Sequence, residues 1–136
     1  MSEDLKAAGW THDAPSGFIG HTGGLWIRKH NDALQFGFVA EPMHSNRNGA
    51  VHGGMLMTFI DRAFGKTARA TTGASLAATV SLTHQFMAPM KLGEFATITP
   101  RVPKVTSRMA FVEGTIFVGD RVILSAQGIW RFSRPD

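Results

Sequence analysis

One long segment of the sequence has the apolar spacing of an α-helix, and it limits the possible folds more than any other feature. The segment runs from about Gly53 to Ala70. At about 3.6 residues per turn, its apolar side chains form one arc: Leu56, Phe59, Ile60, Ala63 and Phe64. Basic side chains form the opposite arc: Arg62, Lys66 and Arg69. We therefore expect the helix to bury the first arc and to expose the second to solvent.

The other ordered segments have the composition of β-strands. Two-residue turns typical of hairpins separate two pairs of them: 24–30 and 33–40 around Asn31-Asp32, and 109–118 and 121–132 around Gly119-Asp120. Residues 76–87 alternate between apolar and polar side chains, and residues 93–102 alternate more weakly. Because one helix cannot cover two separate sheets, the sequence predicts an α+β fold with a curved antiparallel sheet around a central helix.

The chain of 136 residues is long enough for one core, and no repeat, low-complexity tract or linker divides it. We expect a single domain over residues 1–136, with residues 1–22 as an N-terminal extension of short helix and loop. The first ten residues carry acids and lack an apolar stretch, so we expect no secretory signal. No apolar run approaches the ~18 residues of a membrane span. A cytoplasmic protein without a membrane partner is the resulting expectation.

The composition excludes several kinds of site. Without cysteine the chain has no disulfide, no thiolate nucleophile and no zinc-thiolate site, and its six histidines lack the spacing of metal ligands. We therefore expect no metal. The formal net charge of +4 fits either simple solubility or a polyanionic ligand. Because the basic residues are scattered, a few phosphate contacts fit them better than nucleic-acid binding does.

Between residues 46 and 68, residues that suit neither a helix nor a core interrupt the helical pattern. Gly53 and Gly54 stand at the helix start, and Asp61 lies among apolar side chains. On the helix surface the carboxylate falls between the two arcs, in a strip of small or flexible residues: Gly54, Met57, Gly65 and Ala68. Taken singly, Asp61, His52 and the two glycines each have a structural explanation. Asp61 would pair with a nearby Arg or Lys, His52 would bond a local carbonyl, and the glycines would allow tight packing.

Taken together, these residues also meet the needs of acyl transfer. The first N–H groups of a helix are unpaired, and glycines there let a substrate carbonyl come close. Such a place stabilises an oxyanion, and a carboxylate then serves as nucleophile or as base for water. Gly54 and Asp61 are separated by seven residues, or ~10 Å along the helix axis. Two antiparallel copies would place each Gly54 opposite the other's carboxylate, so we expect an active site shared between subunits.

This pattern resembles that of the hotdog-fold acyl-CoA thioesterases, within the 4-hydroxybenzoyl-CoA thioesterase superfamily and in particular the subgroup that contains phenylacetyl-CoA thioesterases. The resemblance rests on Asn46, Gly49, His52-Gly53-Gly54 and Asp61, continues through residues 79–94, and covers about residues 35–132. It implies a long helix wrapped by an antiparallel sheet, homodimers, and commonly homotetramers. It also implies hydrolysis of an acyl- or aryl-CoA thioester to free acid and coenzyme A, which is part of the substrate, with no other cofactor.

The resemblance gives each matching residue a role. The catalytic carboxylate is Asp61, the backbone donor to the thioester carbonyl is Gly54 with Gly53 beside it, Asn46 helps to hold the carbonyl or water, His52 shapes the turn, and Thr79 orients the attacking water. Simple alternation puts Thr79 on the strand face opposite Val80, Leu82 and Phe86. Its role therefore requires a bulge in the strand, or geometry supplied by a partner chain.

Several points stay open at the level of the sequence. Three basic residues around one inter-strand turn are our candidates for the coenzyme A phosphates: Arg101, Lys104 and Arg108. Direct attack by Asp61 and attack by water both fit. A hotdog hydratase or dehydratase would need a His–acid spacing that we do not find, and Asp61 and Asn46 disfavour a non-catalytic acyl-CoA sensor. Five side chains would line an acyl pocket or pack the core: Met43, Met55, Met57, Phe59 and Phe64.

Overall fold

The structure is a computed structural model, and it describes residues 1–134 of the 136-residue chain. The secondary structure within these residues is, in chain order: α1 (Ser2–Ala7), β1 (Thr11–Asp13), α2 (Phe18–His21), β2 (Leu25–His30), β3 (Ala33–Val39), the 3-10 helix η1 (Pro42–His44), α3 (Gly53–Thr72), β4 (Leu76–Phe86), β5 (Phe95–Ile98), β6 (Arg101–Val105), β7 (Met109–Val118) and β8 (Arg121–Ser133). No helix among them is long and apolar enough to cross a membrane.

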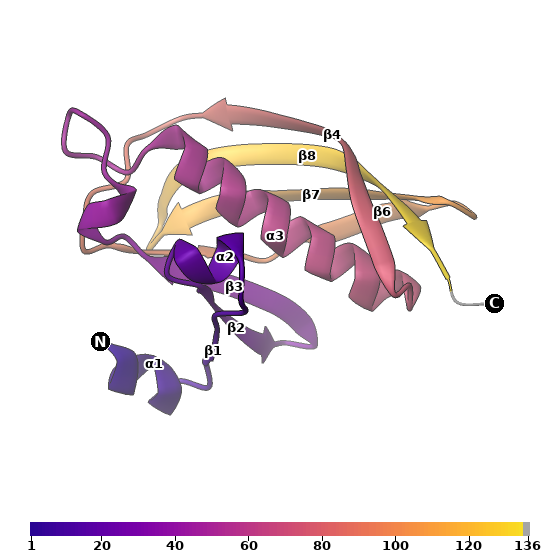
Figure 1. The fold of residues 1–136 in the computed structure, drawn as a ribbon, viewed down its shortest axis with the longest axis horizontal. Helices are drawn as coiled ribbons and strands as arrows, with labels where there is room; N and C mark the ends of the chain where they lie inside the picture. The colour runs from indigo at the N-terminus through magenta and orange to yellow at the C-terminus, as the bar shows by residue number, and fades with distance from the viewer. Residues whose placement is uncertain (135–136) are drawn as a thin grey trace.

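The strands form one antiparallel sheet in the order β1-β2-β3-β5-β7-β8-β4, and β6 pairs with β7 outside this path. Figure 1 shows α3 lying diagonally across the sheet while β4, β8 and β7 curve past it. This arrangement confirms the predicted α+β fold with a central helix and a curved antiparallel sheet.

The sheet has two more strands than the sequence pattern predicts. β1 pairs with β2 over three residues, from Thr11 to Asp13, which is too short a run for alternation to be recognised. The weakly alternating segment 93–102 divides into β5 and β6 at Thr99 and Pro100. Proline has no N–H group to continue a ladder, which explains the break.

Both hairpins lie where the sequence predicts them. Asn31 and Asp32 connect β2 to β3 with positive φ angles of 52° and 63°. Two consecutive left-handed residues are the mark of a type I′ turn, whose twist matches that of the strands it joins. Gly119, with φ of 59°, begins the turn between β7 and β8.

The apolar arc of α3 forms the centre of the core. All five predicted residues of this arc are buried, with Phe59, Ile60, Ala63 and Phe64 fully so. Phe59 packs against Phe38 of β3 with ring centroids 4.7 Å apart, and Phe64 meets Trp130 of β8 at 5.6 Å. Burial of each such side chain contributes roughly 1.5–3 kcal/mol. The helix continues two residues past the predicted end, because Gly73 closes it in the left-handed conformation with φ of 74°.

The basic arc of α3 is less exposed than the sequence suggests. Asp13 of β1 accepts a hydrogen bond from Arg62 at 3.1 Å and lies 3.8 Å from the Lys66 ammonium. The side chains of Arg62 and Lys66 are 22% and 29% exposed. Burial lowers the pKa of Lys66, while the charge of Asp13 opposes this shift. The N-terminal segment therefore covers the flank of α3 that the helical wheel assigns to solvent.

Candidate functional site

The start of α3 is capped by the side chain of His52. This residue has extended backbone angles, φ −60° and ψ 136°, and its Nδ1 accepts a hydrogen bond from the Gly54 N–H at 2.8 Å. The backbone donor predicted from the sequence is thus already occupied in the single chain. The N–H of Gly53 has no acceptor among residues 1–134. The free donor at the helix start is therefore one residue earlier than predicted.

The space around Gly53 and Gly54 is narrow. A side-chain carbon at Gly53 would lie 3.2 Å from the ring of Phe86, at the end of β4. A side-chain carbon at Gly54 would lie 3.0 Å from Nδ1 of His52. A larger residue in place of Gly53 would press on the Phe86 ring, so glycine suits this position.

Asn46 organises the loop that leads into α3. Its Oδ1 accepts hydrogen bonds from the N–H groups of Asn48 at 2.8 Å and Ala50 at 3.1 Å. Ala50 also bridges to Lys91, which ties the loop to the segment after β4. The side chain is half-buried, and its Nδ2 amide group has no acceptor among the described residues. Its oxygen therefore holds the loop, and its nitrogen is free to donate to a ligand.

Asp61 and Thr79 meet on the flank of α3 that faces β4. The Thr79 hydroxyl donates to Oδ1 of Asp61 at 2.6 Å, a short distance typical of a hydrogen bond to a carboxylate. The structure thus brings together two residues that are 18 positions apart in the sequence. Both side chains are exposed in the single chain, so the second carboxylate oxygen is open to solvent.

A β-bulge turns Thr79 toward the helix. Thr79 pairs with Trp130 of β8 and Ser81 with Ile129, so Val80 is an extra residue without a partner. Before the bulge, Thr79 shares the helix-facing side of the sheet with buried Trp130. After it, Leu82 takes that side opposite Gly128. The bulge reverses the alternation, so Thr79 faces the helix. Such a bulge is what the expected role of Thr79 requires.

His84 is a polar neighbour of this site that the sequence analysis did not single out. It pairs with Ala126, on the helix-facing side that Leu82 and Phe86 also share. Its Nδ1 is buried and has no hydrogen-bond partner among residues 1–134. Burial lowers the pKa of His84, and the negative charge of Asp61 partly opposes this shift. The signal in the sequence is that His84 stands between Leu82 and Phe86 in a series of alternate residues that are otherwise apolar.

A cavity of about 510 Å³ lies at the start of α3, lined by Gly54 and His52 but not by Asp61. Met43 and Met55, two of the five apolar candidates, also line it. Phe59 and Phe64 are instead fully buried in the core. Met57, the fifth candidate, is 43% exposed and does not line this cavity.

The helix start and the carboxylate are separate within one chain. Gly53 and Asp61 are eight residues apart on α3, or ~12 Å along the axis. The neighbouring strand β4 ends the sheet, so one of its edges has no partner in the described part of the chain. It exposes three large apolar side chains: Leu76, Val80 and Phe86.

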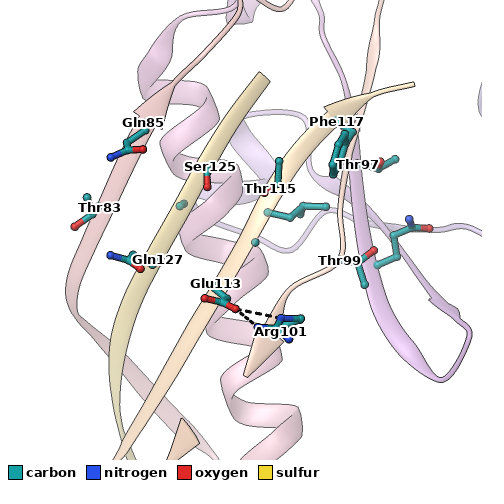
Figure 2. Close-up of a pocket in the computed structure, with 14 residues that line it drawn as sticks. Thr83, Gln85, Thr97, Thr99, Arg101, Glu113, Thr115, Phe117, Ser125 and Gln127 are labelled. Carbon is teal, nitrogen blue, oxygen red and sulfur yellow. Dashed lines mark hydrogen bonds and ion pairs between the residues drawn. The ribbon is translucent and has the colours of Figure 1, made fainter. Parts of the chain in front are cut away.

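The three candidate phosphate-binding residues lie on β6 and the turn that follows it. Arg101 forms an ion pair with Glu113 of β7, and Lys104 and Arg108 are exposed. Figure 2 shows Arg101 and Glu113 among polar side chains on the face of the sheet directed away from α3. Arg101 and Glu113 line a second hollow, of about 670 Å³. A phosphate at Arg101 would therefore compete with the Glu113 carboxylate, on the sheet face opposite the helix that carries Asp61.

No group of three or more potential metal ligands occurs within residues 1–134.

Comparisons with known proteins agree with the fold and with the family suggested by the motif. A relative named as a candidate esterase in Pseudomonas aeruginosa is 32% identical over 88 residues, which span 64% of this chain and 66% of that protein. The chain thus matches just under two thirds of the length of this relative.

Three solved structures superpose well. Thioesterase superfamily member 2 of zebrafish has a TM-score of 0.78 and 22% identity over 88% of each chain. The PaaI protein from the phenylacetic acid degradation operon of Escherichia coli has a TM-score of 0.69 and 18% identity over 74% of this chain and 72% of its own. A protein of Streptococcus mutans bound to acetyl CoA has a TM-score of 0.69 and 19% identity over 75% and 83%. At such identities the likeness concerns the fold, which is the hotdog fold.

The family assignment rests on the sequence itself. The model of the thioesterase superfamily matches residues 48–125, more than half of the chain. The matched segment begins beside the Asn46 loop and includes the start of α3, the Asp61–Thr79 pair and most of the sheet. The chain therefore belongs to the thioesterase superfamily.

Proposed function

We propose that this protein hydrolyses acyl-CoA thioesters to a free acid and coenzyme A. The observation that carries the proposal is the hydrogen bond of 2.6 Å between Thr79 and Asp61. It holds one carboxylate oxygen in a fixed position and leaves the other free at an exposed position of the helix. The family membership and the fold shared with a protein bound to acetyl CoA support this choice of substrate class.

In this proposal each site residue has a defined task. The N–H of Gly53, with Nδ2 of Asn46, polarises the thioester carbonyl and stabilises the oxyanion that develops on it. Asp61 removes a proton from water, or attacks the carbonyl carbon itself. In the water route, attack gives a tetrahedral oxyanion, the C–S bond then breaks, and the proton that Asp61 took from water passes to the departing thiolate, so that coenzyme A leaves as the thiol. In the direct route, Asp61 displaces the thiolate and forms a mixed anhydride. A water molecule then hydrolyses this anhydride, which releases the free acid, restores the carboxylate and supplies the proton of the thiol. Gly54 would take part only if the His52 ring turned away from its N–H.

The proposal includes a site shared by two subunits. The ~12 Å between Gly53 and Asp61 along the axis is too long for one thioester carbonyl to touch both. An antiparallel pairing of α3 with α3 of a second copy would bring the two halves together twice. The unpaired edge of β4 and its exposed apolar side chains lie beside the flank of α3 that carries Asp61 and offer a surface for such a pairing.

The direct test measures thiol release from a panel of acyl-CoA substrates by the wild type and by Asp61→Asn. The amide keeps the size of the side chain but is neither a base nor a nucleophile, so the rate should fall by at least ~100-fold. Asp120→Asn is the matched control, because Asp120 lies in the turn between β7 and β8. It should retain the wild-type rate.

Two outcomes would contradict the proposal. If the wild type releases no thiol from any member of the panel, the activity is not that of a thioesterase. If Asp61→Asn turns over at the wild-type rate, the carboxylate has no part in the chemistry. Melting temperatures of both variants, compared with the wild type, separate a catalytic loss from a loss of folding.

A further inference from the structure

The cavity at the start of α3 has the walls of an acyl pocket. Its lining comes from three elements: Phe18 and His21 of α2, Met43 of η1, and Gly54, Met55 and Thr58 of α3. Its volume of about 510 Å³ is within the usual range for small-molecule sites. The sequence analysis named Met43 and Met55 for such a pocket and missed Phe18, which lies in the N-terminal extension.

Two of the apolar lining residues are exposed in the single chain. Phe18 is 68% exposed and Met43 is 57% exposed, whereas Met55 forms a buried floor. Removal of apolar surface from water stabilises a complex by about 25 cal/mol per Å² of surface buried. A ligand with an apolar part would therefore be held between Phe18 and Met43 above the floor.

The wall formed by α2 is held in place before any ligand binds. His44 of η1 is buried, and its Nε2 donates to the Thr22 carbonyl at the end of α2 at 2.7 Å. Nδ1 of His44 accepts the Glu41 N–H at 2.9 Å, which leaves the ring hydrogen on Nε2. Ile19 packs against the main core. Phe18 thus projects from a short helix that is fixed on both sides, so binding would not need to order it.

The position of the cavity identifies which part of the substrate it would hold. Thr58 follows Gly54 by four residues and Asp61 follows Thr58 by three, so the three lie on one side of α3, where Gly54 and Asp61 are exposed. A thioester carbonyl at the helix start has two substituents, the acyl chain and the pantetheine arm. The pantetheine arm carries amides, whereas the acyl chain has the apolar character of Phe18, Met43 and Met55.

We propose that this cavity binds the acyl group of the substrate, and that Phe18 and Met43 select apolar acyl groups larger than acetyl. This inference rests on the proposed thioesterase function and adds the substrate class. An acetyl group would fill only a small part of a cavity of about 510 Å³. A medium-chain or aryl group would fill more of it and could bury the exposed faces of Phe18 and Met43.

The test compares kcat/KM for acetyl-CoA, octanoyl-CoA and phenylacetyl-CoA in the wild type, Phe18→Ala and Met43→Ala. One lost apolar contact in a pocket typically changes discrimination by 10-fold or more. We expect each variant to lose about 10-fold on octanoyl-CoA or phenylacetyl-CoA, and less than about 2-fold on acetyl-CoA. Because both side chains are exposed, the variants should fold. Phe117→Ala, a matched truncation in the hollow on the other face of the sheet, should change none of the three values.

A binding measurement separates failure of this inference from failure of the proposed function. A non-hydrolysable thioether analogue of octanoyl-CoA, titrated by calorimetry, should bind about 10-fold more weakly to Phe18→Ala than to the wild type. That result supports the pocket even if the wild type hydrolyses nothing. If the ratio of octanoyl to acetyl activity and the analogue affinity are both unchanged in the two variants, the acyl group does not occupy this cavity.

Discussion

The pairing of Asp61 with its neighbours gives a prediction for His84. Burial lowers the pKa of the imidazole from its ordinary value of 6.5, and the charge of Asp61 raises it in part. In an NMR titration the His84 ring should therefore show a midpoint below 6.5. The Asp61→Asn substitution removes the negative charge that stabilises the imidazolium. The midpoint should then fall further.

The sign of this shift also sets its effect on stability. Unfolded His84 takes up a proton near its ordinary pKa of 6.5, before the folded protein does. The free energy of unfolding should consequently decrease as the pH falls below that value. Asp120→Asn serves as the control for the titration and should leave the midpoint in place. A higher midpoint in Asp61→Asn would show that the two groups do not interact as the structure suggests.

At the residue scale, the motif singled out Asp61, Asn46 and the glycines as candidates, and their catalytic roles stay a prediction. It could not show which backbone N–H is free, because that depends on the rotamer of one side chain. His52 turns its Nδ1 onto the Gly54 N–H, and the Gly53 N–H is left without an acceptor. Such a choice between adjacent donors follows from local geometry, which a residue pattern does not contain.

At the scale of elements, strand alternation failed at one residue of β4. Period-two counting places Thr79 away from Leu82, and this holds only while no residue is inserted. The extra residue Val80 reverses the pattern, and nothing in the composition of the strand marks the insertion. The α3 helix, by contrast, has no such irregularity over its 20 residues, and all five residues of the predicted arc are buried. The buried face is wider than predicted, because Gly65 and Ala68 of the boundary strip are buried as well.

The cap of α3 gives a prediction about this element. His52→Ala removes the acceptor of the Gly54 N–H, and loss of a helix N-cap typically costs about 0.5–2 kcal/mol. Urea unfolding should show this decrease in the free energy of unfolding. In His52→Asn the amide oxygen can accept the same hydrogen bond, so most of the stability should remain. Equal stability of His52→Ala and the wild type would mean that the imidazole contributes no cap.

At the scale of the whole molecule, the two halves of the proposed site lie apart in the single chain. Asp61 and Thr79 are exposed on the side of α3 next to β4, and the edge of β4 has no partner among residues 1–134. The free N–H of Gly53 lies about two helical turns away, at the start of α3. Helix geometry was sufficient to predict this separation from the sequence, because it depends only on the number of residues between the two groups. The arrangement of the second copy remains a prediction.

Mixed dimers test whether two chains share each site. One chain carries Asp61→Asn and the other carries Gly53→Pro, which deletes the free N–H. Proline is well tolerated at the first helical position, and the extended backbone of His52 suits a residue that precedes proline.

Each homodimer of one variant would then have two defective sites. If each site takes Gly53 from one chain and Asp61 from the other, a mixed dimer has one site with both defects and one with neither. About half of the wild-type activity per dimer should therefore return when the two variants are co-expressed. Mixed dimers that form but stay inactive would place both halves of the site on one chain, and would exclude the shared arrangement.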